Sequence, residues 1–305
     1  MRAIARSLLT TLALTALLGG VAACGADQDG GGGPAGGAEP SATSPGRAEV
    51  TPAPGAHTLT LTWAGADRTA LLHAPPSYRP GTPVPLVVAL HGNGQSVDGL
   101  RADSGLDALA DQKGFLVAYP SALGSGFSAL SCCGGVDDVG FIRALVGELT
   151  GRWSVDPDRI YATGYSIGAE MAYKLGVEAA DVFAAIAPVS GAFRGGRASA
   201  DPGYKPSRPV SLITFIGYDD RNATAMYTGL AQWQRNLGCR VGKPAWVGEG
   251  RRVNRTVSSC PDGSEVVDYT VNDLGHAWPS ATGAHPTIDA SAVIWDFFAA
   301  HPRRS

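Results

Sequence analysis

Gly164-Tyr165-Ser166-Ile167-Gly168 is the stretch of sequence that points most directly to the fold. Strand-like residues 159–163 precede it, and residues 167–179 follow with apolar side chains at helical spacing. A G-x-S-x-G sequence between a strand and a helix forms a sharp turn, in which the glycines allow neighbouring backbone to approach closely. The serine hydroxyl then projects at the N-terminus of the helix. We therefore predict that Ser166 is a nucleophile on a strand–turn–helix unit, and not a residue of an ordinary turn.

Short apolar runs alternate with amphipathic segments on both sides of this turn. The runs have the length of strands buried on both faces and cover residues 86–90, 115–119, 160–163, 184–189 and 212–216. The segments with helical spacing cover residues 97–112, 139–149, 167–179, 224–237 and 287–300. This alternation predicts an α/β fold with a mostly parallel central sheet and helices on both faces. Residues 58–63 alternate strictly, so we expect an antiparallel strand there with one exposed face.

Three histidines follow Ser166 in the chain. A serine hydroxyl needs a base to remove its proton, and in folds with this turn the chain order is Ser, then Asp or Glu, then His. His276 comes directly after the strand-like residues 266–271, at a place from which a loop reaches the serine. His285 precedes a proline before the last expected helix, and His301 lies in a polar tail. We predict His276 as the base; the alternative is a loop histidine that only hydrogen-bonds to backbone.

The acid that orients the base is expected on a loop after the preceding strand. Two adjacent carboxylates, Asp219 and Asp220, follow residues 211–216 at that place. We prefer Asp220 and keep Asp219 as the reserve; the alternative is that both are solvated turn residues or cap the helix that follows. Asp268 and Asp273 lie too close to His276 in sequence for an acid on a separate loop.

Two backbone N–H groups are expected to form an oxyanion hole, which stabilises negative charge on the carbonyl oxygen during the reaction. Ile167 follows the nucleophile and supplies one of them. His91-Gly92-Asn93-Gly94 follows the strand-like residues 86–90 and resembles the HG-type loop of lipases and esterases, so Asn93 is the expected second donor. His91 precedes Ser166 in the chain, and we expect it to orient this loop.

The N-terminal residues resemble the signal of a bacterial lipoprotein. Arg2 and Arg6 precede a short apolar run, and the following Val21-Ala22-Ala23-Cys24 is similar to a lipobox, where the signal is cut before a cysteine that receives lipid. We therefore expect residues 1–23 to be a lipoprotein signal peptide and Cys24 to carry the lipid. Residues 24–56 are rich in Gly and Pro and are expected to form a flexible tether, with the catalytic domain at 57–305.

Four further cysteines fit an exported protein, because disulfides persist outside the cytoplasm. Cys239 and Cys260 flank a segment that could form a hairpin, so we favour a disulfide between them. Cys132 and Cys133 are then left as a vicinal pair or as two thiols. No CxxC pattern occurs, and no histidine stands near these cysteines at metal-ligand spacing, so no metal is expected.

The composition excludes some classes of partner. The 305 residues carry 24 Lys and Arg against 27 Asp and Glu, with no basic stretch that could follow a phosphate backbone, so nucleic acid is not an expected partner. Asp137 and Asp138 precede an amphipathic segment, where we expect them to cap a helix and not to bind metal. We expect no cofactor, a monomer, and membrane association through the N-terminal lipid alone.

Several segments together resemble a known esterase family. They are Leu90-His91-Gly92, Ser131-Cys132-Cys133-Gly134-Gly135, Asp137-Asp138-Val139-Gly140-Phe141, Val155-Asp156-Pro157-Asp158-Arg159, the run from Ala184 to Gly191, and Ile294-Trp295-Asp296-Phe297-Phe298. Between about residues 84 and 301 the chain looks like the secreted polyhydroxybutyrate depolymerases, feruloyl esterases and acetyl-xylan esterases. The resemblance implies an α/β-hydrolase fold and assigns Ser166, Asp220 and His276 as nucleophile, acid and base. The chain departs from the family pattern at Ser166-Ile167-Gly168-Ala169, where the family usually has Ser-Asn-Gly-Gly.

The sequence as a whole predicts an extracytoplasmic serine carboxylic-ester hydrolase that forms an acyl-enzyme. The expected substrate is a small or short oligomeric ester. The chain departs from the family pattern a second time at Ile216-Gly217, before the candidate acids, where the family usually has His-Gly. Because of these two departures, the alternative is a lipid-anchored surface binding protein that keeps the hydrolase fold with little turnover.

Overall fold

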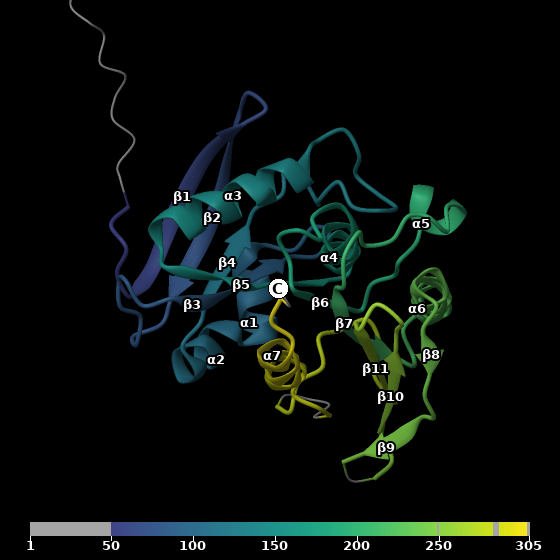
Figure 1. Cartoon of the computed structure of the whole chain (residues 1–305). Coiled ribbons are helices and arrows are strands. Elements are labelled where there is room, and N and C mark those ends of the chain that lie inside the picture. The colour runs from purple at the N-terminus through teal and green to yellow at the C-terminus, as the bar shows by residue number, and fades with distance from the viewer. Residues whose placement is uncertain (1–49, 249, 283–286, 304–305) are drawn as a thin grey trace, which may run out of the picture. The chain divides into compact units, whose positions relative to one another are not determined.

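The computed structural model describes residues 50–248, 250–282 and 287–303, in which a mixed sheet of 11 strands forms the centre of the domain (Figure 1). The strands are β1 (Gly55–Trp63), β2 (Ala66–Ala74), β3 (Val84–Leu90), β4 (Leu116–Pro120), β5 (Val155–Tyr165), β6 (Ala185–Val189), β7 (Ser211–Gly217), β8 (Arg240–Val241), β9 (Ala245–Val247), β10 (Val253–Ser259) and β11 (Glu265–Val271). The helices are α1 (Val97–Ser104), α2 (Leu106–Lys113), α3 (Asp138–Arg152), α4 (Ile167–Glu178), α5 (Gly196–Ala200), α6 (Ala223–Leu237) and α7 (Ala290–Ala300).

The sheet is parallel at its centre and antiparallel at both ends. Its strand order is β1-β2-β4-β3-β5-β6-β7-β11-β10-β8, with β9 paired to β10. The neighbours from β4 to β11 run parallel, whereas β1 and β2 form an antiparallel hairpin and β10 runs antiparallel to β11. The predicted parallel sheet of an α/β-hydrolase fold is therefore confirmed, as is the antiparallel strand over residues 58–63.

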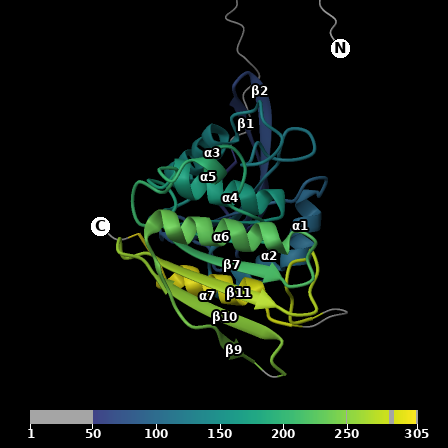
Figure 2. The ribbon, with the colours of Figure 1, turned by 90° about the vertical axis from the view of Figure 1, so that its right-hand side faces the viewer.

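Both faces of the parallel strands are buried, which explains their continuous apolar sequences. In β3, for example, Leu86 and Val88 belong to the core beneath α3, α4 and α6, while Val87 and Ala89 belong to the core beneath α1, α2 and α7. Figures 1 and 2 show these two sets of helices on opposite faces of the sheet. The carboxyl ends of the parallel strands therefore lie along one edge, between the two helix layers.

Two helices differ from their predicted bounds for identifiable reasons. The segment expected as one helix over residues 97–112 is divided into α1 and α2 at Gly105, which has φ 61° and ends α1 in the left-handed conformation. The last helix begins at Ala290, because the Asp289 carboxylate accepts a hydrogen bond from Ala292 N at 3.0 Å and caps it.

Strand β2 has no counterpart in the prediction, and a buried arginine explains why. Its burial alternates along the strand as a period of two requires, but one of the inward-facing side chains is Arg68, which is 1% exposed. Its Nη2 lies 2.5 Å from the Asp138 carboxylate, and its guanidinium lies over the Phe141 ring at 4.0 Å. Of the two aspartates expected to cap α3, Asp137 caps it by accepting from Gly140 N, while Asp138 pairs with Arg68.

The structure contains two disulfides. Cys239 is joined to Cys260, the pairing that the sequence favours, and the bridge closes the segment that forms β8, β9 and β10. Cys132 and Cys133 are joined to each other. The sequence left a vicinal pair or two thiols as alternatives for these adjacent cysteines, and the vicinal disulfide is the one observed. Two disulfides are typical of a protein that works outside the cytoplasm.

The N-terminal predictions fall almost entirely outside the described residues. Residues 1–49, which include the expected signal peptide and Cys24, are not described. Gly55 and Ala56, which the sequence analysis places in the tether, are the first two residues of β1. Within the described ranges, no helix has the length and hydropathy needed to span a membrane.

Candidate active site

Ser166 lies at the sharp turn between β5 and α4. Its backbone has φ 57° and ψ −117°, a conformation that is rare for a residue with a side chain. The flanking glycines are required by close packing: a Cβ on Gly168 would lie 2.1 Å from the Leu90 carbonyl oxygen, and one on Gly164 would lie 2.4 Å from that of Gly168. The strand–turn–helix unit predicted for these residues is therefore confirmed, and it presents the serine at the carboxyl edge of the sheet.

Ser166, His276 and Asp220 are hydrogen-bonded in series. The Ser166 Oγ lies 2.8 Å from His276 Nε2, and His276 Nδ1 lies 2.6 Å from Asp220 Oδ2. A carboxylate only accepts, so Nδ1 carries the proton in a neutral ring and Nε2 accepts from the serine hydroxyl. The Asp220 side chain is fully buried, whereas that of His276 is 25% exposed. The arrangement can remove the serine proton and stabilise the imidazolium that results.

The loop after β7 separates the two candidate acids. The second Asp220 oxygen accepts from Asn222 N at 2.8 Å, so the carboxylate is held from both sides. Asp219 is exposed, and its backbone N–H donates to the Leu274 carbonyl at 3.0 Å. Residues 218–222 after β7 are called the acid loop below, and residues 272–280 after β11 the histidine loop. Gly217 allows the two loops to lie against each other, since a Cβ there would be 2.4 Å from the Leu274 carbonyl oxygen. The structure thus places Asp220, and not Asp219, against His276.

Two hydroxyl groups that the sequence analysis does not identify hold the histidine loop. Tyr165 Oη donates to the His276 carbonyl at 2.8 Å, and Ser190 Oγ donates to the Ala277 carbonyl at 2.8 Å. Burial, followed by the charges of Asp220 and Asp103, raises the pKa of Tyr165 to about 12, so its hydroxyl stays protonated. Tyr165 is the variable residue before the serine in the G-x-S-x-G sequence. Its position next to Ser166 was the one feature of the sequence that could have indicated a role in the site.

The residues expected to form an oxyanion hole lie on the loop after β3 and at the start of α4. Among the described residues, no protein acceptor is hydrogen-bonded to the N–H of Asn93 or of Ile167. Both groups are therefore available to a carbonyl oxygen. His91 is buried and bridges two loops: its Nε2 accepts from Ala122 N at 3.2 Å, and its Nδ1 donates to the Gly92 carbonyl at 2.9 Å. This agrees with the loop-orienting role expected for it.

Of the other two histidines after Ser166, His301 does not take part in this arrangement. His301 ends α7, where its Nδ1 lies 2.7 Å from the Phe297 carbonyl oxygen. His285 lies outside the described residues. In the part of the chain that the structure describes, no group of three or more His, Cys, Asp or Glu side chains could hold a metal ion.

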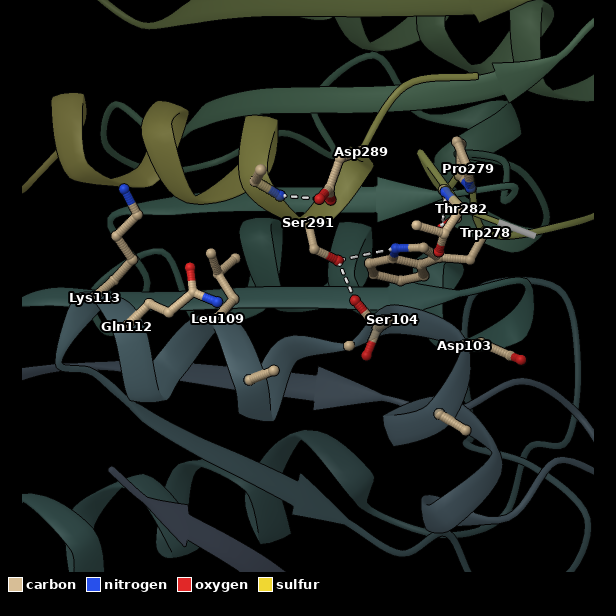
Figure 3. A pocket seen from close by; sticks show the side chains of 15 residues that line it. Asp103, Ser104, Leu109, Gln112, Lys113, Trp278, Pro279, Thr282, Asp289 and Ser291 are labelled. Atoms are coloured by element: carbon tan, nitrogen blue, oxygen red, sulfur yellow. Dashed lines mark hydrogen bonds between the residues drawn. The ribbon is translucent and has the colours of Figure 1, made fainter. Parts of the chain in front are cut away.

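A cavity of about 430 Å³ lies beside the histidine loop, lined chiefly by residues of α1, α2 and α7 (Figure 3). Trp278, two residues after His276, forms part of its wall. Its Nε1 donates to Ser291 Oγ at 3.0 Å, and that hydroxyl donates to the Ser104 carbonyl at 2.5 Å, as the dashed lines in Figure 3 show. None of Ser166, Asp220 and His276 lines the cavity. These bonds fix the histidine loop to helices on the face opposite α4.

Comparison with known proteins shows which family this chain resembles. The family model described as esterase PHB depolymerase matches residues 70–204. A protein of Nocardia uniformis subsp. tsuyamanensis named as an esterase, NocK, is 33% identical over 72% of this chain and 73% of its own length. Poly(3-hydroxyalkanoate) depolymerase C of Paucimonas lemoignei is 36% identical over 72% of this chain, which matches 62% of the depolymerase.

The fold also has counterparts among solved structures. The acetyl xylan esterase from Aspergillus awamori aligns with a TM-score of 0.62 and 18% identity, over 80% of this chain and 99% of that enzyme. At this identity the likeness shows the fold alone. Together with the family match and the Nocardia relative, these observations show that the chain belongs to the PHB depolymerase family of esterases and is a carboxylic-ester hydrolase.

Proposed function

We propose that Ser166, His276 and Asp220 are the catalytic triad of an extracytoplasmic serine esterase that acts through an acyl-enzyme. The observation that carries this proposal is the series of two hydrogen bonds from Ser166 through His276 to Asp220. The backbone strain at Ser166 supports it, because such strain persists where the surrounding structure holds a functional side chain in place.

In the proposed reaction, Ser166 Oγ attacks the ester carbonyl while His276 Nε2 takes the hydroxyl proton. The N–H groups of Asn93 and Ile167 stabilise the negative charge of the tetrahedral intermediate. His276 returns the proton to the departing alcohol, which leaves the acyl group on the serine. A water molecule then gives a proton to His276 and attacks the acyl carbon. The bond from that carbon to Ser166 Oγ breaks, and His276 returns the proton to Oγ, which releases the acid and restores the enzyme.

Soluble short-chain esters and short ester oligomers are the proposed substrates. Ser166 and His276 are both partly exposed to solvent, so a small ester can reach the serine. The relatives named as feruloyl esterase and as polyhydroxyalkanoate depolymerase act on different esters by name, so the activity must be tested on a panel.

The deciding experiment compares wild type with Ser166→Ala on p-nitrophenyl acetate, methyl ferulate and soluble hydroxybutyrate oligomers. A fluorophosphonate should label wild type and leave the variant unlabelled, since it modifies only an activated serine. We expect hydrolysis of at least one soluble ester by wild type. Absence of both turnover and labelling would show the protein to be a binding protein with a hydrolase fold.

We further propose that Cys24 carries a lipid that holds the enzyme at the outer side of the cytoplasmic membrane. The proposal rests on the lipobox-like residues 21–24. In a bacterial host that processes lipoproteins, Cys24→Ala should move the protein from the membrane fraction to the soluble fraction with unchanged kcat. A variant that stays in the membrane fraction would overturn the assignment.

A further inference from the structure

The loop between β4 and α3 lies against the candidate oxyanion residues. This loop, residues 121–137, contains the Cys132–Cys133 disulfide and is called the cysteine loop below. Its Ser125 carbonyl accepts a hydrogen bond from Gly94 N at 2.6 Å, directly after Asn93. Its Ala122 N–H donates to His91, directly before Gly92. The cysteine loop is therefore hydrogen-bonded to the loop after β3 on both sides of Asn93.

Gly126 brings the cysteine loop closest to the site. It is buried, and a Cβ added to it would lie 3.0 Å from Asn93 Oδ1, 3.4 Å from Ile167 Cγ2 and 3.6 Å from Cys133 Sγ. The side chains of both proposed oxyanion donors and a disulfide sulfur thus surround one point beside Gly126. A shift of Cys133 would change the space around that point, which the Asn93 and Ile167 side chains share.

The cysteine loop is held near Cys133 by a buried serine. Ser128 Oγ donates to the Cys133 carbonyl at 2.7 Å and accepts from Val136 N at 3.2 Å. Ser128 N donates to the Asp138 carboxylate at 2.6 Å, and Asp138 is the partner of Arg68. Cys133 itself has φ 66°, a backbone conformation that costs free energy for a residue other than glycine and must be held by its surroundings.

A second attachment joins the cysteine loop to the helix that begins after Ser166. Glu170 of α4 is buried, and its Oε2 accepts from Ser131 Oγ at 2.5 Å and from Ser131 N at 3.2 Å. Its Oε1 accepts from Arg194 Nε at 3.0 Å. Ser131 directly precedes Cys132, so the loop is fixed to the nucleophile helix on one side of the disulfide and to Ser128 on the other.

We propose that the Cys132–Cys133 disulfide is a positioning element of the oxyanion hole, which acts through Gly126 on Asn93 and Ile167. The inference rests on the proposed esterase function. The disulfide closes a small ring around one peptide group, which limits the conformations of the two cysteines. Two separate side chains at these positions move apart to non-bonded distance, which shifts the Cys133 sulfur from its place beside Gly126.

The first test replaces both cysteines by serine. Cys132→Ser/Cys133→Ser should lower kcat on p-nitrophenyl acetate about tenfold with KM within about twofold, because a misplaced oxyanion donor weakens transition-state binding more than substrate binding. Affinity for a boronic acid that forms a tetrahedral adduct with Ser166 should fall by a similar factor. Cys239→Ser/Cys260→Ser is the matched control and should leave kcat and boronic acid affinity unchanged.

The second test keeps the disulfide and changes one glycine. Gly126→Ala places a methyl group against Asn93 and should lower kcat about fivefold to tenfold. Gly134→Ala makes the same change in the same loop where no atom lies within 4 Å, and kcat should not change. This pair tests the route through Gly126 even if the double cysteine variant does not fold.

Two results would overturn the inference while leaving the proposed function intact. One is a folded Cys132→Ser/Cys133→Ser enzyme with wild-type kcat and boronic acid affinity. The other is equal kcat for Gly126→Ala and Gly134→Ala. Failure of the proposed function is recognised separately, since wild type itself would then show neither ester hydrolysis nor labelling by a fluorophosphonate.

Discussion

The two disulfides of this esterase differ in what they constrain. Cys132–Cys133 joins neighbouring residues in the loop that lies beside Asn93 and Ile167, whereas Cys239–Cys260 spans 21 positions and closes the segment that forms the β8–β10 end of the sheet. A bridge over a long segment stabilises mainly by restricting the unfolded chain. A bridge between neighbours closes almost no loop, so its effect must come from local geometry in the folded state. We therefore expect the Cys132–Cys133 disulfide to affect mainly activity and the Cys239–Cys260 disulfide to affect mainly stability.

Removal of the nucleophile should give the largest change in activity without a loss of stability. Ser166→Ala should lower kcat by a factor on the order of 10⁴ to 10⁶, because the members of a triad act as one unit. Its thermal unfolding midpoint should stay equal to or above that of wild type, since the strained serine makes no contact that the core requires. Ester hydrolysis and calorimetry on the same preparation check both statements. Residual turnover near the wild-type rate would refute the assignment of Ser166.

The acid loop provides a comparison between two neighbouring residues. Asp220→Ala should lower kcat by a factor on the order of 10³ to 10⁴, since His276 then loses the partner that sets its tautomer. Asp219→Ala removes an exposed carboxylate, and kcat should stay within about twofold of wild type. If steady-state kinetics show the reverse order, Asp219 is the acid.

At the β8–β10 end of the sheet, the expected effect is on stability. Cys239→Ser/Cys260→Ser should lower the free energy of unfolding by about 3 kcal/mol, as expected for a closed segment of this length. Urea unfolding measures the change, and kcat on p-nitrophenyl acetate should be unaffected at temperatures where the variant is folded. A matching loss of kcat would show that the Cys239–Cys260 disulfide also affects the active site.

Asp268 of β11 should give the smallest effect, and one that depends on pH. Burial raises the pKa of Asp268 to about 6, above the value of about 3.9 for an unfolded aspartate, so the folded state binds the proton more tightly. Its contribution to stability is therefore present below about pH 4 and is lost as the pH rises to about 6. Asp268→Asn should raise the free energy of unfolding by about 1 to 2 kcal/mol at pH 7 and change it little at pH 4. Calorimetry at both pH values tests this, and an equal shift at the two would contradict it.

The sequence predicts the centre of the site because that part depends on local patterns and on one general rule. The turn at Ser166 is defined by five consecutive residues. Asp220 and His276 each follow a buried parallel strand, and the carboxyl ends of such strands meet at one edge. Their placement along one edge therefore follows from their positions directly after parallel strands, without knowledge of side-chain contacts.

The supporting residues could not be predicted in the same way. The hydroxyls of Tyr165 and Ser190 bond to carbonyls of the histidine loop, which lies more than 80 residues further along the chain. The position of Gly126 beside the Asn93 side chain depends on the path of a loop that has no regular structure. Such contacts are set by tertiary packing, and a short polar pattern does not specify them.

The secondary-structure differences have equally local causes. Gly105 divides a segment whose apolar spacing is continuous, because a left-handed residue ends one helix and begins the next. In β2, the alternating pattern is hidden by a charged residue at an inward position. Arg68 is compatible with that position only because Asp138, 70 residues away, supplies the opposite charge.

The Arg68–Asp138 pair has a consequence for anyone who wishes to redesign this enzyme. Replacement of either residue alone leaves a buried charge without its partner, which costs about 3 to 5 kcal/mol, while joint replacement by apolar residues of similar volume is often neutral. A mutational library that varies one position at a time would therefore record both sites as immutable. Only a combinatorial library that varies the two codons together would find the allowed exchanges. Ser128 donates to Asp138, so such exchanges would also change which residues are accepted at Ser128 in the cysteine loop.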